Sequence, residues 1–471
     1  MAFAARPVRC AWDEVEEVRA MTSAGSGVVD PSEDATRRQF WKWSFVAAMA
    51  GYIDAGSIVA GSVGLGLWVR TFGLSDSTVG LLGAFSSNAI SAGVGALIGG
   101  YVCDKYGRKK IYAYDLLLYM FGTLWIIFAV NTPMLFVGYV IVGLTVGADI
   151  PASWSLITEF SPADSRGKFG ALAQVLWSLG PVVTLLLGLA LQPLGMLGIR
   201  LLFAHLFLVA LVTWWMRHGI GESALWKREV ATGAGASGSS RGVRWTDGVR
   251  PLLSRRALPT MLFLIGMYGI WNLFAGTNGF YYPYLLQVFG SQSEAASVGL
   301  QSLYFLLVAL FTGLVFMPLN DRINRRLLFA LSSLIQMIGV LFLALLPLNF
   351  TTALGYILAI GIGGGFGAQH FFQLWSGELF PTRLRSTAQG LMFAVVRIAL
   401  GIWSFFVPLV TATGFRNLAF ILAGFLFVSG VIGTVFGPRT EGRTLEEIET
   451  SGGWQRPPSG ELAAGAAATD Q

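Results

Sequence analysis

The sequence predicts an all-α polytopic membrane protein, with twelve transmembrane helices arranged as two six-helix bundles. Its composition is the first observation: of 471 residues, 54% are hydrophobic and only 12% are charged, whereas a soluble globular chain is about 25% charged. The second observation is a set of twelve apolar runs, each long enough to cross a hydrocarbon core of about 30 Å. The third is a polar central segment that divides these runs six and six.

Each apolar run is expected to be one helix. The first six runs span 43–67, 78–101, 111–130, 134–157, 169–192 and 199–216. The second six span 258–286, 296–318, 327–348, 352–376, 387–411 and 416–437. The equal halves predict an internal repeat. The expected organisation is an N-terminal segment 1–40, a bundle 41–216, a central loop 217–256 with a flexible Gly/Ser/Ala stretch, a bundle 257–437 and a tail 438–471.

The distribution of Lys and Arg predicts the orientation in the membrane. With twelve helices, all but four of the 32 Lys and Arg residues fall on the side that carries both termini. The exceptions are Arg70, Arg200, Arg416 and the intramembrane Arg397. Basic loops face the cytoplasm, so both termini are expected there, in the plasma membrane. Because the basic residues are dispersed over short loops, the net charge of +6 is a topology signal, and no nucleic-acid partner is expected.

A patterned loop follows the second helix. Gly100 to Lys109 reads G-x-x-x-D-K-x-G-R-K. Gly107 suits a backbone reversal, Asp104 can face a helix N-terminus, and Arg108 can hold a carboxylate. A degenerate copy follows the eighth helix, where Asp321 and Arg325 keep the spacing of Asp104 and Arg108.

Two further loops mirror each other between the halves. Each has a Glu, a Pro three residues later and an Arg seven residues after the Glu: Glu159 with Arg166, and Glu378 with Arg385. A solvated charged face is the simpler interpretation. The repeated spacing favours a cytoplasmic gate instead, in which these four residues and Arg108 bridge the halves when the inside is closed. Buried ion pairs cost desolvation, so they suit a switch better than a permanent brace.

These loops resemble the signature loops of the major facilitator superfamily, and in particular its sugar-porter branch. The segment from Gly437 to Glu447 resembles the same branch, and the similarity extends over about residues 40–450. The resemblance implies a secondary transporter that binds a small substrate between its two halves and works by alternating access.

Four charges stand out within predicted helices, where each costs about 2.5–3.5 kcal/mol on insertion scales. They are Asp54, Asp149, Arg397 and Asp115, the last about one turn into helix three and near the headgroups. On one interpretation Asp54 or Asp149 carries a proton, because a low-dielectric cavity favours the neutral carboxyl. On the other, one of them is a structural partner of Arg397. Asp54 resembles the helix-one Asp of proton-coupled sugar porters, whose helix-four Arg is replaced here by Tyr139.

The substrate residues are predicted by the same resemblance and by amide chemistry, since amides offer a donor and an acceptor to each hydroxyl. Gln174 matches a sugar-contacting Gln of the family, Asn272 and Asn278 match in part, and Arg397 replaces a family Trp. Gln369, His370 and Gln373 lie together in helix ten.

A sugar or an inositol-like polyol is therefore the favoured substrate. A small organic anion is the alternative, because Arg397 would hold a carboxylate. Two local resemblances point the same way: Asp149 lies in a segment like helix four of phosphate:proton symporters, and Arg397-Ile398 resembles the helix-eleven Arg of organic-anion porters.

Other classes of protein lack support in the sequence. Two cysteines, Cys10 and Cys103, make neither a disulfide framework nor a zinc cluster. The glycine-rich run 361–367 lies in a membrane helix and is not a nucleotide-binding loop. A membrane-embedded enzyme is a remote alternative, since no nucleophile and base occur together. We therefore expect a proton-coupled symporter, not an enzyme, that is monomeric in the lipid bilayer and has no cofactor or metal.

Overall fold

The computed structural model describes residues 37–160, 166–218, 249–255, 257–290, 292–320, 322–441 and 448. Within these ranges the chain is helical and contains no strand. Among the described residues, ten helices are long and apolar enough to cross a membrane, and two shorter apolar helices, Ile90–Cys103 and Tyr114–Ile127, accompany them. The predicted all-α membrane fold is confirmed.

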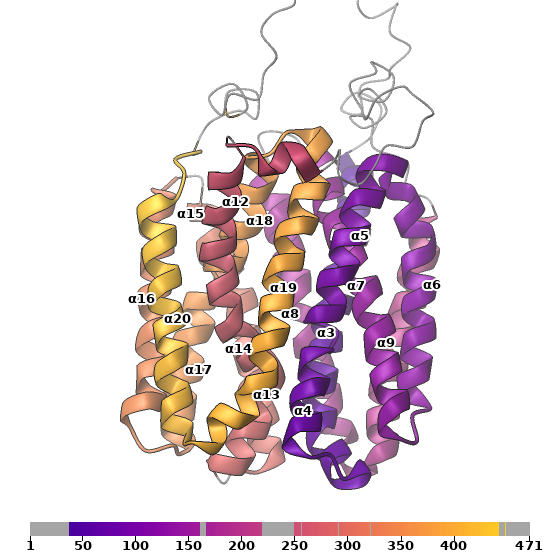
Figure 1. Cartoon of the computed structure of the whole chain (residues 1–471), viewed down its shortest axis with the longest axis vertical. Coiled ribbons are helices and arrows are strands. Elements are labelled where there is room, and N and C mark those ends of the chain that lie inside the picture. The colour runs from indigo at the N-terminus through magenta and orange to yellow at the C-terminus, as the bar shows by residue number, and fades with distance from the viewer. Residues whose placement is uncertain are drawn as a thin grey trace, which may run out of the picture.

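The described spans divide six and six between the halves of the chain, and the two halves form bundles that stand side by side (Figure 1). The N-terminal bundle, indigo to magenta, contains α3 (Arg37–Phe72), α4 (Asp76–Ala84), α5 (Ile90–Tyr106), α6 (Arg108–Ile127), α7 (Thr132–Phe160), α8 (Arg166–Leu191), η1 (Gln192–Leu194) and α9 (Met196–Arg217). The C-terminal bundle, red to yellow, contains η2 (Arg250–Leu253), α12 (Leu258–Leu264), η3 (Ile265–Gly269), α13 (Ile270–Phe289), α14 (Glu294–Phe311), η4 (Thr312–Phe316), α15 (Met317–Leu319), α16 (Arg325–Leu345), α17 (Phe350–Gly364), α18 (Ala368–Glu378), α19 (Thr382–Ala412) and α20 (Phe415–Phe436).

The outer faces of both bundles are apolar. Large side chains such as Leu118, Phe121 and Leu208 in the N-terminal bundle and Leu334 and Phe427 in the C-terminal bundle are more than 40% exposed. A soluble protein seldom exposes such a continuous apolar surface, whereas lipid tails solvate it. The chain is a multi-pass membrane protein.

The second crossing is broken at its middle, which corrects the single helix expected over 78–101. α4 ends at Ala84 and α5 begins at Ile90. The intervening segment contains Ser86, Ser87 and Asn88, whose short polar side chains compete with helical backbone bonds. Ser91 Oγ donates to the Phe85 carbonyl at 3.1 Å, and the Ser86 hydroxyl accepts from the amide of Asn88 at 3.4 Å. The break leaves the backbone of Asn88 available to a partner outside the helix.

The tenth crossing is also broken, which corrects the single helix expected over 352–376. α17 ends at Gly364 and α18 begins at Ala368, directly after Gly367. A Cβ added at Gly365 would lie 2.5 Å from the Cβ of Phe311. Glycine is therefore required by the close approach of α14, and the helical ladder is interrupted there. The break places Gln369 and His370 in the first turn of α18.

The two bundles meet mainly where α19 packs along α4 and α5, where α14 packs against α8, and where α13 packs against α3. Gly100 lies on this interface, and a Cβ there would lie 2.6 Å from the Ser386 carbonyl oxygen. The interface is therefore backbone to backbone at this point. Gly107, the expected reversal point, has φ of +91° between α5 and α6, and that prediction is confirmed.

Candidate functional site

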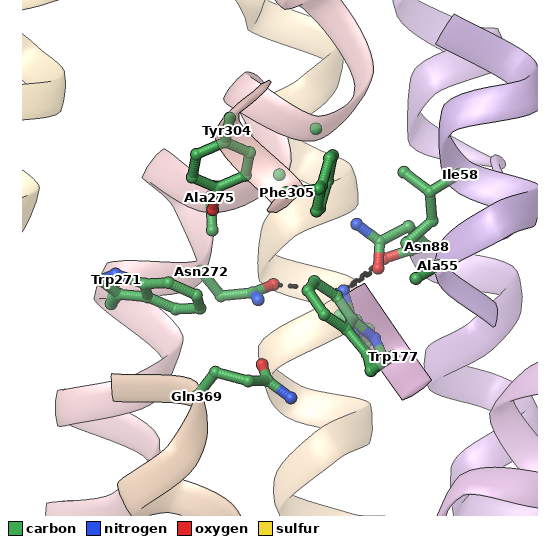
Figure 2. Close-up of a pocket in the computed structure, with 13 residues that line it drawn as sticks. Ala55, Ile58, Asn88, Trp177, Trp271, Asn272, Ala275, Tyr304, Phe305 and Gln369 are labelled. Atoms are coloured by element: carbon green, nitrogen blue, oxygen red, sulfur yellow. Dashed lines mark hydrogen bonds between the residues drawn. The ribbon is translucent and has the colours of Figure 1, made fainter. Parts of the chain in front are cut away.

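A cavity of about 440 Å³ lies between the two bundles (Figure 2). Both halves of the chain line it. The N-terminal bundle contributes Ala55, Ile58, Asn88 and Trp177, and the C-terminal bundle contributes Trp271, Asn272, Ala275, Gly276, Gly279, Tyr304, Phe305, Gln369 and Arg397. Its polar groups are mainly amides, and its walls are aromatic. Such a lining suits a small hydroxylated molecule, because amides bind hydroxyls and rings cover the apolar faces.

Arg397 reaches across this cavity from α19. Its Nη1 donates to the main-chain oxygen of Asn88 at 3.2 Å and also to the side-chain oxygen of Asn88. The same nitrogen lies 3.5 Å from Oδ1 of Asn272. In Figure 2 Asn88 and Asn272 come from opposite bundles and their oxygens are turned toward the same point. The break in the second crossing therefore supplies the carbonyl that Arg397 binds.

Asn272 and Gln369 sit beside Arg397 on the C-terminal side of the cavity. The Nδ2 of Asn272 donates to the Tyr268 hydroxyl at 3.3 Å, which fixes the orientation of the amide. Gln369 occupies the first turn of α18, and the break before that helix turns it toward the cavity (Figure 2). Three of the predicted substrate residues, Asn272, Gln369 and Arg397, are therefore brought together.

Asp54 lines a second cavity of about 340 Å³, which shares Trp177 with the central cavity. Its side chain is buried, and its Oδ2 accepts a hydrogen bond of 3.2 Å from Trp177 Nε1. Trp177 lines both cavities, so its indole connects the carboxylate of Asp54 to the wall of the central cavity. Gln174 and Ser153 line the cavity of Asp54 as well.

Gln174 and Gln373 face each other across the interface between the bundles. The side-chain amide of Gln174, from α8, donates to the amide oxygen of Gln373, from α18. The two hydroxyls of Ser155 and Ser386 make a second cross-bundle contact at 2.7 Å. Both bonds join the N-terminal bundle to the C-terminal bundle.

Asp149 is paired with Arg217, a residue that the sequence placed only in a basic loop. Arg217 Nη2 lies 2.7 Å from Asp149 Oδ2, and its Nη1 lies 2.9 Å from Asp115 Oδ2. The three side chains are at most 6% exposed. Ser153 Oγ donates to Asp149 Oδ1 at 2.9 Å. The alternative pairing of Asp149 with Arg397 is not what the structure shows.

Four predicted substrate residues do not line the central cavity: Gln174 and Gln373, which face each other across the interface, and Asn278 and His370. Asn278 accepts a hydrogen bond from the Tyr356 hydroxyl at 3.0 Å. The Nε2 of His370 lies 2.8 Å from the Thr312 hydroxyl, and its ring packs on Phe316. Asn278 and His370 are both held inside the C-terminal bundle.

The structure describes the side chains of only some of the predicted gate residues. Arg325 Nη1 lies 2.9 Å from Glu378 Oε2 and donates to the Thr440 hydroxyl at 2.5 Å, while its backbone amide donates to Glu441 at 2.8 Å. Arg385 Nη2 donates to the Phe380 carbonyl at 3.3 Å. Asp321 lies outside the described residues, and so do the side chains of Asp104, Arg108, Glu159 and Arg166. These contacts of Arg325 and Glu378 tie together elements of one bundle.

Sequence reasoning missed Asn88, Trp177, Trp271 and Arg217. The Ser-Ser-Asn run in an apolar helix was a usable signal for Asn88, because three short polar residues disfavour a continuous helix. Trp177 and Trp271 gave no signal, since apolar helices contain many aromatic residues. Arg217 ends its helix beside a basic loop, and only the fold shows that it turns inward.

The comparisons with known proteins agree with this geometry. The minor myo-inositol transporter IolF of Bacillus subtilis is 45% identical over 412 residues, which cover 87% of this chain and 93% of that protein. The glucose transporter GlcP of Staphylococcus epidermidis is 26% identical over 406 residues, covering 80% and 89%. The structure of the proton:xylose symporter XylE bound to 6-bromo-6-deoxy-D-glucose matches with a TM-score of 0.69 at 20% identity, over 87% of this chain and 98% of that one.

The family and these relatives are transporters and not enzymes. A family model described as "Sugar (and other) transporter" matches residues 32–451. The match spans both bundles, the central cavity and the loop motifs. The chain belongs to the sugar (and other) transporter family, with the fold of the major facilitator superfamily.

Proposed function

We propose that this protein is a proton-coupled symporter of a small polyhydroxylated metabolite, a sugar or polyol, with an inositol-like cyclitol favoured. The central cavity carries the proposal, because amides from both bundles and four aromatic rings surround a space of about 440 Å³. A hydroxylated ring offers donors and acceptors around its edge, which amides match, and apolar faces, which aromatic rings cover. The relative named as a myo-inositol transporter supports the cyclitol.

Asp54 is the proposed proton carrier. Its carboxylate is buried in the bundle, yet the one hydrogen bond described for it is the donation from Trp177. Trp177 also lines the central cavity, so a substrate that displaces the indole changes the surroundings of the carboxylate. Asp149 is the second candidate, because Ser153, which donates to it, lines the same cavity as Asp54.

Alternating access is the proposed mechanism. Cross-bundle bonds such as Gln174 to Gln373 hold one side closed, and the ion pair of Arg325 with Glu378 braces the C-terminal bundle near the same end. On the opposite side Arg70 lies 4.0 Å from Glu294 across the interface. The bundles exchange these contacts as the cavity opens to one side and then the other.

The proposal includes the orientation in the membrane, the cellular location and the oligomeric state. The loops rich in Lys and Arg support a cytoplasmic location for both termini, and the proposal is a monomer in the plasma membrane. Its partners are the substrate, protons and the surrounding lipid.

Uptake into proteoliposomes tests the proposal. Labelled myo-inositol is expected to accumulate when an inward proton gradient is applied, and to equilibrate slowly without one. Asn272→Leu and Gln369→Leu should each lower uptake at least about tenfold, because each removes an amide from the cavity. Gln192→Leu, at an exposed position outside the cavity, is the matched control. If Asn272→Leu and Gln369→Leu retain wild-type uptake, the cavity is not the substrate site.

A further inference from the structure

We propose that Arg397 is an anion subsite in the central cavity, so that a polyol bearing a carboxylate, a sugar acid, binds more tightly than its neutral counterpart. The inference rests on the proposed function, because the hydroxyls of the sugar acid would use the same amides. It adds a carboxylate to the proposed substrate and assigns the binding of that carboxylate to one edge of the Arg397 guanidinium.

The hydrogen bonds of Arg397 use only one corner of its guanidinium. The bonds to Asn88 and the 3.5 Å contact with Asn272 all start from Nη1. Nε is buried without a hydrogen-bond partner, and no hydrogen bond is described for Nη2. These two nitrogens form one edge of the planar group. A guanidinium edge of two parallel N–H groups is the geometry that binds both oxygens of a carboxylate.

The plane of the guanidinium is fixed before a ligand arrives. Its Cζ lies 4.3 Å from the centroid of the Phe393 ring, and Nη1 is anchored on Asn88. The side chain is 3% exposed and lines the cavity. A preorganised donor loses less rotational freedom on binding than a flexible one, so the free edge is ready for an acceptor.

Charge balance favours an anion on this edge. Among the residues that the structure describes, no carboxylate lies within 4.0 Å of Arg397, whereas Arg217 has two and Arg325 has one. The groups in contact with the Arg397 guanidinium are amides, a carbonyl and a ring, and the carboxylate of Asp54 acts on it only from beyond contact distance. A buried cation with no carboxylate in contact is costly within a membrane, and a ligand carboxylate on the free edge supplies one.

A pair of isosteric ligands tests the subsite directly. D-glucuronate and D-glucuronamide share a ring and its hydroxyls, and differ in having a carboxylate or a neutral amide. Isothermal titration of the purified full-length protein in detergent should show that glucuronate binds at least about tenfold more tightly than glucuronamide. Myo-inositol, titrated in parallel, reports whether the cavity binds neutral polyols.

Substitutions assign the effect to the side chain. Arg397→Gln should bring the affinities for glucuronate and glucuronamide within about twofold of each other. Arg397→Lys keeps the charge and should retain part of the preference. Thermal unfolding of each variant checks its folding, and if neither variant folds, the two ligands on the wild type decide the matter.

The outcomes separate the two proposals. Equal affinities on the wild type, or a preference that survives in Arg397→Gln, overturn the anion subsite and leave the polyol proposal standing if myo-inositol binds. Failure of myo-inositol, glucuronate and glucuronamide alike overturns both.

Discussion

The guanidinium of Arg397 in α19 donates to the main-chain oxygen of Asn88 at 3.2 Å, and this bond joins the two bundles at the central cavity. The acceptor is available because the second crossing is broken between α4 and α5. Opening the cavity to either side requires the bundles to move apart, so this bond has to lengthen or break in each cycle.

Strengthening that bond should slow transport. Asn88→Asp replaces the amide by a carboxylate that would form a buried ion pair with Arg397, and charge-assisted bonds are about twice as strong as neutral ones. We expect uptake to fall at least about tenfold with no loss of thermal stability. Asn88→Ala, which leaves the main-chain acceptor in place, is the comparison and should reduce uptake less. Wild-type uptake by Asn88→Asp would show that the bond does not limit the cycle.

Removing the carboxylate of Asp54 should uncouple substrate transport from proton transport. Asp54→Asn keeps the shape of the side chain but cannot gain or lose a proton. We expect myo-inositol accumulation under a proton gradient to be lost, while exchange of labelled for unlabelled myo-inositol continues without a gradient. The exposed Asp76→Asn is the control and should accumulate substrate like wild type. Gradient-driven accumulation by Asp54→Asn would assign the proton to another group.

The paired carboxylates of Asp115 and Asp149 should make Arg217 important for stability. Arg217→Gln leaves two buried carboxylates without their cation, a loss of about 3–5 kcal/mol when one partner of a buried pair is removed. Thermal unfolding in detergent should therefore show a clearly lower midpoint. Asp115→Asn leaves one carboxylate for the cation and should be milder. The exposed Arg416→Gln should unfold like wild type, and an equal midpoint for Arg217→Gln would contradict a structural role.

A disulfide across the interface should stop the cycle. The hydroxyl oxygens of Ser155 in α7 and Ser386 in α19 lie 2.7 Å apart, so a cysteine pair there can be oxidised without a large backbone movement. The double variant Ser155→Cys with Ser386→Cys should lose uptake on oxidation and regain it with a reductant. Each single variant should be indifferent to both treatments. Unchanged uptake by the oxidised, cross-linked protein would contradict separation of the bundles at this point.

The architecture could be predicted from the sequence because the membrane imposes strong rules. Long apolar runs, a polar central segment and the distribution of Lys and Arg each follow from the cost of polar groups in lipid. The breaks at Ser86 to Asn88 and at Gly365 to Gly367 were missed, because hydropathy alone does not distinguish a continuous helix from a broken one.

The site could be predicted only in part. Asn272, Gln369 and Arg397 stand out as polar residues in apolar helices, and all three line the cavity. Asn278 and His370 stand out equally, yet their partners Tyr356 and Thr312 lie within the C-terminal bundle. Whether a polar residue faces a cavity or a neighbouring helix depends on helix rotation and on partners distant in sequence, and one sequence does not give these.

Proton-coupled symport is tested by recording the protons that enter with the substrate. Proteoliposomes containing the protein are suspended in weakly buffered medium, and unlabelled myo-inositol is added outside while the external pH is recorded. We expect the wild type to make the medium more alkaline when myo-inositol is added, and Asp54→Asn to cause no such change. No pH change in the wild type while labelled myo-inositol still enters would contradict proton-coupled symport.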